Sequence, residues 1–178
     1  MPPTANAARY VFPVEGKSSY AREHHDYPAT DIIAACGLMV RAVTDGVVLE
    51  VSRIDNFDKK TSKGEERGGL SVSMLGDDGV RYYGSHFSAI DESVRPGVRV
   101  AAGTRLGLVG RTGNANNTCH LHLGISPPCA STGDWWIRRG VIWPWSYLDA
   151  WKAGTFRSPV AEIQAWHQAH GCPPEPKN

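Results

Sequence analysis

The sequence lacks any long apolar run and any excess of one charge. No stretch of its 178 residues approaches the roughly 20 consecutive apolar residues that a membrane-spanning helix needs. The 19 Lys and Arg residues are balanced by 18 Asp and Glu residues. We therefore expect no membrane span, and the balanced net charge does not indicate a nucleic-acid partner.

Cysteine is scarce and forms no C-x-x-C motif, which argues against a cysteine-based structural zinc site. The even number permits two disulfides, as in an exported protein. Free buried thiols are an equal alternative, and the spacing does not choose among the three pairings. The four positions are Cys36, Cys119, Cys129 and Cys172.

The N-terminus, Met1 to Thr4, also lacks the basic and apolar regions of a signal peptide. Two interpretations follow from this observation. Either the protein is cytoplasmic, or the sequence begins after a removed export signal.

What is present favours a mainly β domain. Nineteen glycines and twelve prolines predict many turns, and short alternating segments predict antiparallel strands. Hairpins are expected across Asp45-Gly46 and across 76–79, and the charged stretch 55–69 is expected to be an exposed loop. The expected strands are 10–14, 31–35, 39–43, 47–51, 70–75, 80–86, 98–101, 106–109 and the segment that holds His120 and His122.

The composition changes after residue 130, where tryptophan becomes frequent. Helices are expected at 146–152 and 159–169, and the tryptophans are interpreted as packing residues rather than a ligand platform. The predicted organisation is a lead-in (1–9), a main domain (10–130), a Trp-rich extension packed on it (131–172) and a tail (173–178).

The strand that carries His120 and His122 is the centre of the functional prediction. Side chains alternate between the two faces of a strand, so both imidazoles share one face and Leu121 and Leu123 share the other. A packed apolar face behind two imidazoles is a rigid way to present a metal ligand beside a general base. Two solvated surface histidines are the plain alternative.

Further histidines and one carboxylate lie elsewhere in the chain and could converge on this strand. His24, His25 and Asp31 lie in or just after the first loop, and His86 ends an expected strand. A catalytic zinc ion has three protein ligands and one open position. One first-loop histidine, Asp31 and one histidine of the strand would supply that set.

Five elements occur in the order typical of one known family. From about Phe12 to Ile125 they are the first loop with Asp31, GLMVRAVTDGVV at 37–48, YGSHFS at 83–88, glycine-spaced hairpins at 100–113, and HLH at 120–122. Together they resemble the lysostaphin-type (LytM-like) zinc metallopeptidases, which are peptidoglycan endopeptidases. The resemblance implies an antiparallel β-sheet fold of that type, like the duplicated hybrid motif, here with a short helical C-terminal extension.

The resemblance also implies residue roles. A first-loop histidine, Asp31 and His122 would bind one zinc ion. His120 would be the general base that activates a water, and His86 would assist it and stabilise the tetrahedral intermediate. The family's first motif commonly reads His-x-Gly-x-Asp, whereas Asp31 follows His25 by six positions and His24 by seven. We favour His25 as the ligand, with His24 as its neighbour.

Another departure concerns Tyr83, which lies one position further from His86 than the family's tyrosine, so no direct role is assigned to it. The resemblance implies a secreted or cell-envelope monomer that acts on peptidoglycan peptides, in preference to a cytoplasmic protein. The alternatives are a catalytically silent regulator of another cell-wall hydrolase, a peptidase that acts on proteins, and a carbohydrate-binding module that uses the tryptophans.

Overall fold

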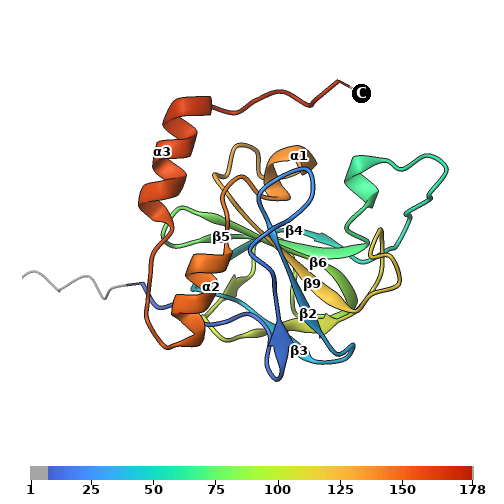
Figure 1. Cartoon of the computed structure of the whole chain (residues 1–178), viewed down its shortest axis with the longest axis horizontal. Coiled ribbons are helices and arrows are strands. Elements are labelled where there is room, and N and C mark those ends of the chain that lie inside the picture. Colours follow the sequence, from blue (N-terminus) through green and yellow to red (C-terminus); the bar gives the residue numbers. More distant parts are fainter. Residues whose placement is uncertain (1–7, 178) are drawn as a thin grey trace, which may run out of the picture.

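The computed structural model describes residues 8–177, so most of the expected lead-in lies outside the described part. Figure 1 shows a twisted antiparallel sheet, with α2 and α3 on one side of it and the segment around η1 on the other. None of the described helices is long and apolar enough to cross a membrane. The elements are β1 (Ser18–Ser19), β2 (Thr30–Ala34), β3 (Met39–Arg41), β4 (Gly46–Ser52), η1 (Gly64–Glu66), β5 (Leu70–Gly76), β6 (Arg81–Ile90), β7 (Arg99–Val100), β8 (Arg105–Val109), β9 (His120–Ser126), α1 (Trp135–Arg138), α2 (Trp145–Lys152) and α3 (Val160–His170).

The strands form one sheet in which the main order is β1-β2-β9-β6-β5-β4-β7, and β8 joins β3 to β6. Every pairing between these strands is antiparallel, which confirms the predicted fold class. β9 lies in the interior of the sheet between β2 and β6. Its ladder partners on both sides fix the direction of each of its side chains.

The two faces of β9 differ as its alternating sequence predicts. Leu121 and Leu123 are 1% and 3% exposed and belong to the main hydrophobic core. Burial of such side chains stabilises the sheet by about 1.5–3 kcal/mol each. The packed core behind β9 therefore provides a stiff support for the opposite face, which carries His120 and His122.

The hairpin expected across Asp45-Gly46 is not formed. β3 pairs with β8, and β4 pairs with β5 and β7. The Asp45 side chain instead accepts a hydrogen bond from the Ala102 amide, 2.7 Å away. Gly46 lies so close to the Leu75 carbonyl that an added Cβ would be 2.2 Å from its oxygen. The glycine is therefore explained by close packing of neighbouring strands and not by a turn.

The hairpin between β5 and β6 is formed as expected, with Leu75 opposite Arg81. Residues 10–14 do not form the expected strand, and only Val14 makes an isolated bridge, to Val40. This segment still packs into the core through Tyr10 and Phe12. Its apolar residues were therefore a sign of burial and not of sheet pairing.

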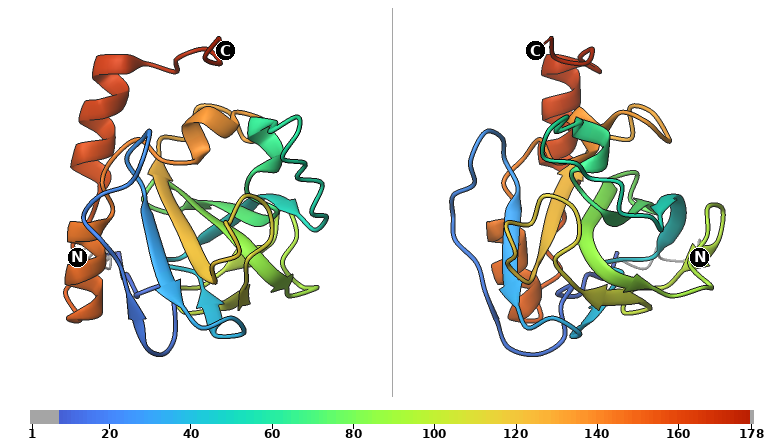
Figure 2. Two further views of the ribbon diagram at one scale, coloured as in Figure 1. Left: turned by 45° about the vertical axis from the view of Figure 1, so that its right-hand side comes forward. Right: turned by 90° about the vertical axis from the view of Figure 1, so that its right-hand side faces the viewer.

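The region after β9 contains the two helices expected from the sequence, as α2 and α3, and the short helix α1 that was not expected. Leu148 and Trp151 of α2 are buried, and the Trp151 ring stacks on Tyr10 with centroids 5.2 Å apart. In Figure 2, α1 lies at the same end of the sheet as the loop before β2 and η1. The extension thereby contributes to the surface around the site described below.

All four cysteines are paired, which decides between the two alternatives left open by the sequence. One disulfide joins Cys36 to Cys119, and the other joins Cys129 to Cys172. Cys119 directly precedes His120, so the first bridge anchors the beginning of β9 to the turn after β2.

Candidate metal centre

Asp31 and His122 lie directly opposite each other on β2 and β9. Directly opposed residues in an antiparallel pair have side chains on the same face. Asp31 Oδ1 is 3.1 Å from His122 Nδ1, and the Asp31 side chain is one-third exposed. Two of the residues expected to bind zinc are therefore brought together by the register of two neighbouring strands.

The first loop adds His24 to this pair. His24 Nε2 lies 3.4 Å from Asp31 Oδ1, and the His24 side chain is only 2% exposed. Its other nitrogen, Nδ1, donates to the Tyr27 carbonyl at 3.0 Å, which turns Nε2 toward the carboxylate.

The expected ligand His25 is not part of this group, and His24 lies in the place expected for it. The His25 side chain is 67% exposed and its Nδ1 faces Asp26, at 3.4 Å. Its ring stacks on the outside of His24, with centroids 4.1 Å apart. The Tyr27 carbonyl holds the His24 ring in the position expected for His25. The sequence alone does not show where this carbonyl lies.

One nitrogen or oxygen each from His24, Asp31 and His122 lies within 4.8 Å of the others. A tetrahedral zinc ion with bonds of about 2.0–2.1 Å would place its ligand atoms roughly 3.3 Å apart. The separations of 3.4 Å and 3.1 Å from Asp31 agree with that requirement. The three side chains fit a single divalent cation.

The hydrogen bonds on the outer side of each ring point to the same conclusion. His122 Nε2 donates to the Arg139 carbonyl at 2.8 Å, as His24 Nδ1 does to the Tyr27 carbonyl. A neutral imidazole carries one N–H, so the nitrogen that faces Asp31 is then a lone pair. Lone pairs directed at a carboxylate need a cation or a proton between them.

The charge state of Asp31 agrees with this environment. Burial by itself would raise the pKa of Asp31, but the imidazoles of His122 and His24 beside it together outweigh burial and hold the pKa well below its usual range. Asp31 is therefore an anion at any pH near neutrality. An anionic carboxylate between two imidazoles is the donor set that zinc prefers.

His120 and His86 lie beside the three metal-ligand candidates. His120 shares the face of His122, and its Nε2 is 3.9 Å from Asp31 Oδ1. The His86 and His120 rings have centroids 4.6 Å apart. Both rings donate from Nδ1 to a backbone carbonyl, His86 to Thr112 at 2.7 Å and His120 to Thr118 at 2.8 Å. Both Nε2 atoms are therefore free to accept a proton.

His86 reaches the cleft through an irregular backbone. Its neighbour Ser85 is opposite His122, so a regular strand would send the His86 side chain to the other face. The backbone of His86 instead has φ of +68°, and the pairing of β6 with β8 shifts between Phe87 and Ala89. Such irregularities re-aim a side chain beside functional sites. Burial, together with the rings of His120 and His122, lowers the pKa of His86 to about 3.

The site opens into a cleft of about 260 Å³ that brings together distant parts of the chain. Sequence reasoning missed the contribution of the C-terminal extension to its lining, because no motif links that extension to the histidines. The lining includes Tyr27, Arg67, Asn114, Trp135, Arg138 and Arg139 in addition to the histidines and Asp31.

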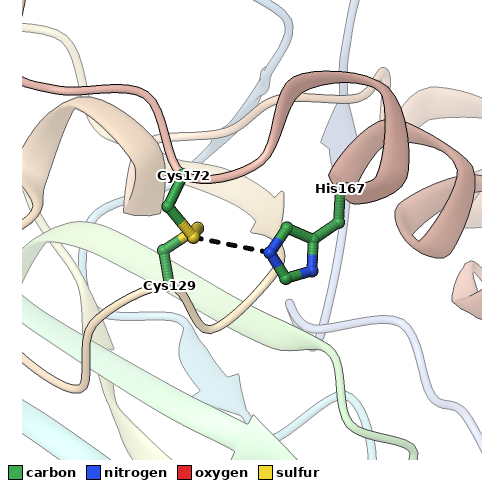
Figure 3. A group of neighbouring side chains, drawn as sticks. All are labelled: Cys129, His167 and Cys172. Atoms are coloured by element: carbon green, nitrogen blue, oxygen red, sulfur yellow. Dashed lines mark hydrogen bonds between the residues drawn. A yellow bond between two sulfur atoms is a disulfide. The ribbon is translucent and has the colours of Figure 1, made fainter.

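A second group of potential ligands lies at the C-terminus, where Cys129, His167 and Cys172 are neighbours (Figure 3). His167 Nε2 is 3.4 Å from Cys172 Sγ. The two sulfur atoms are bonded to each other, and a metal needs thiolates. This group is therefore a structural clamp.

The fold and the site define the class of protein: an antiparallel β-sheet protein with a histidine–carboxylate centre on one face of its central strands. A family model described as Peptidase family M23 matches residues 25–132, and the chain belongs to this family. The matched segment contains Asp31, His86, His120 and His122.

Solved structures with a similar fold agree with this assignment. A putative glycyl-glycine endopeptidase LytM from Ruminococcus gnavus is 22% identical with a TM-score of 0.63, and the match covers 85% of this chain and 63% of that one. The catalytic domain of the antimicrobial peptidase lysostaphin from Staphylococcus simulans is 20% identical with a TM-score of 0.55, covering 75% and 92%. These likenesses establish the fold. No curated protein gives a significant match.

Proposed function

We propose that this chain is a zinc-dependent endopeptidase that hydrolyses the peptide cross-links of bacterial peptidoglycan. The observation that carries the proposal is the convergence of His24, Asp31 and His122, in which one nitrogen of each ring lies 3.4 Å or 3.1 Å from the same carboxylate oxygen. This assignment replaces His25 by His24 and keeps the other two expected ligands.

When bound, zinc supplies a Lewis acid and lowers the pKa of a water molecule to about 7. The outer hydrogen bonds of His24 and His122 hold the ligand rings in place. His120 Nε2 accepts a proton from the nucleophile, and the Thr118 carbonyl stabilises the resulting imidazolium through Nδ1–H. His86, at ring contact with His120, assists this transfer and orients the reacting carbonyl.

The substrate class is supported by the family and by the similar structures, which include lysostaphin and a protein described as a putative glycyl-glycine endopeptidase. Two disulfides fit a secreted or cell-envelope protein, because such bonds persist in oxidising compartments. A monomer suffices for the proposed activity, because all the residues assigned to it belong to one chain.

The test is a zinc measurement on the purified protein, followed by digestion of cell-wall preparations with and without a chelator. We expect about one zinc per chain and release of peptide fragments that stops on chelation and resumes with added zinc. Bound zinc without turnover would favour the silent regulator. Cleavage of a denatured protein but not of the cell wall would favour a general peptidase.

A further inference from the structure

The cleft contains an arginine that lies directly beside the proposed metal centre. The carbonyl of Arg139 accepts the Nε2–H of His122 at 2.8 Å, so the Arg139 side chain leaves the backbone at the edge of the site. Arg139 and Arg67 line the same cleft as Asp31 and the four inward-facing histidines.

Aromatic rings hold the Arg139 guanidinium by its faces. Its Cζ atom lies 4.0 Å from the centroid of the Tyr27 ring and 5.3 Å from that of Trp135. Such contacts use the flat face of the cation and leave its N–H edge free. Tyr27 and Trp135 thus fix the position and orientation of the Arg139 guanidinium, while its N–H groups remain available for hydrogen bonds.

The hydrogen-bonding capacity of Arg139 is not used within residues 8–177. Arg139 Nε is buried without a hydrogen-bond partner, and no ion pair joins its guanidinium to a described carboxylate. Its neighbour Arg138, in contrast, is paired with Glu50. A buried donor without an acceptor costs about 1–3 kcal/mol, which a bound acceptor would recover.

A second cation approaches the same space. The backbone carbonyl of Arg67 accepts a hydrogen bond from the backbone amide of Asn114 at 2.8 Å, and its guanidinium donates to the Ser62 carbonyl at 3.1 Å. Burial and the charge of Arg67 both lower the pKa of Arg139. Tyr27 and, more weakly, Asp26 act in the opposite direction, and the Asp26 side chain is 83% exposed and lies beside His25. Two like charges with so little compensation favour the binding of an anion.

We propose that Arg139, together with Arg67, binds a free carboxylate of the substrate peptide next to the scissile amide. This inference rests on the proposed function and narrows its substrate class. The preferred substrates are cross-links between stem peptides, which carry free carboxylates, and not an uncharged glycine bridge. Arginine suits this role because its fork of N–H groups binds a carboxylate with two parallel hydrogen bonds.

The test compares three probes: a cross-linked stem-peptide dimer, the same dimer with every carboxylate converted to a carboxamide, and N-acetyl-pentaglycine amide. Binding is measured by calorimetry on the zinc-loaded His120→Ala variant, and hydrolysis on the zinc-loaded wild type. We expect the free dimer to bind about tenfold more tightly than its carboxamide, as charge-assisted hydrogen bonds imply. The advantage should shrink as salt is raised.

The variants identify the residues responsible. Arg139→Gln should abolish the preference for the free dimer over its carboxamide, and Arg67→Gln, at the more exposed of the two residues, should reduce this preference. Arg139→Lys should restore only part of it. Arg157→Gln is the matched control, because Arg157 also lies over a tyrosine ring, that of Tyr147, outside the cleft.

The inference would be overturned by equal binding of the two dimers by the wild-type cleft, or by a preference that survives in both Arg139→Gln and Arg67→Gln. Efficient cleavage of the glycine probe in preference to the free dimer would also overturn it, while the proposed endopeptidase activity would stand. Preferential binding without any hydrolysis would reject the proposed activity and support the carboxylate site. Thermal melting of each variant checks that it is folded.

Discussion

His24 Nε2 lies 3.4 Å from Asp31 Oδ1, although seven positions separate the two residues in the sequence. The neighbouring His25 stacks on the outside of His24 and faces solvent. Two adjacent histidines in one loop therefore have different environments, and this difference can be measured.

Replacing His24 by Ala should remove the metal, whereas replacing His25 by Ala should leave it bound. Mutation of a group that only hydrogen-bonds to a metal ligand lowers the metal affinity by about 10- to 100-fold. Loss of a ligand itself should therefore weaken zinc binding by more than about 100-fold. Metal analysis after dialysis against a weak chelator provides the measurement. Retention of zinc in His24→Ala together with its loss in His25→Ala would reverse the assignment.

His120→Ala and His86→Ala should keep the metal and lose turnover. Proton transfer by a positioned side chain contributes about 10²–10⁴-fold, so kcat/KM should fall by that factor while zinc content remains near one. His170→Ala in α3 is a suitable control, because that side chain is exposed and bonds only locally to Trp166. Full activity of His120→Ala would show that another group accepts the proton.

The disulfide between Cys36 and Cys119 should affect both stability and the site. Removal of a native disulfide from a small domain costs about 2–5 kcal/mol, and Cys119 is adjacent to His120. Replacing both cysteines by Ser should therefore lower the free energy of unfolding and reduce turnover. The matched pair of replacements at Cys129 and Cys172 should lower stability with a smaller effect on turnover. Chemical denaturation and peptide hydrolysis measure the two quantities, and equal losses of turnover in both variants would contradict this expectation.

Tyr10 should make the fold sensitive to alkaline pH. Burial raises the pKa of Tyr10 to about 12; the hydrogen bond to Ser158 opposes this effect, and the hydrogen bond to Asp78 adds to it. The unfolded chain therefore loses this proton near pH 10 while the folded chain keeps it. The contribution of the Tyr10 proton to the free energy of unfolding is fully present below pH 10. It should be lost, by up to about 2–3 kcal/mol, as the pH rises to 12.

Tyr10→Phe keeps the ring that stacks on Trp151 and removes the titrating group. Its unfolding free energy should be flatter between pH 10 and 12 than that of the wild type. An unchanged slope would mean that another group dominates the alkaline transition.

Local pattern was sufficient for much of the fold. The alternation around His120 and Leu121 predicted a strand with one polar and one packed face, because side-chain direction in a strand has a period of two. Rules based on local sequence failed where the geometry is irregular. His86 reaches the site through a positive φ, and Asp45-Gly46 serves inter-strand packing instead of a hairpin.

The sequence alone determined the residue types of the centre and the strand that presents His120 and His122, since both follow from chemistry and from local periodicity. Only the tertiary structure decided that His24 and not His25 faces Asp31, because a single carbonyl contact in a folded loop sets that choice. The tertiary structure likewise placed Arg139 beside His122. That contact joins parts of the chain whose proximity depends on packing over long sequence distances, and no local pattern encodes it.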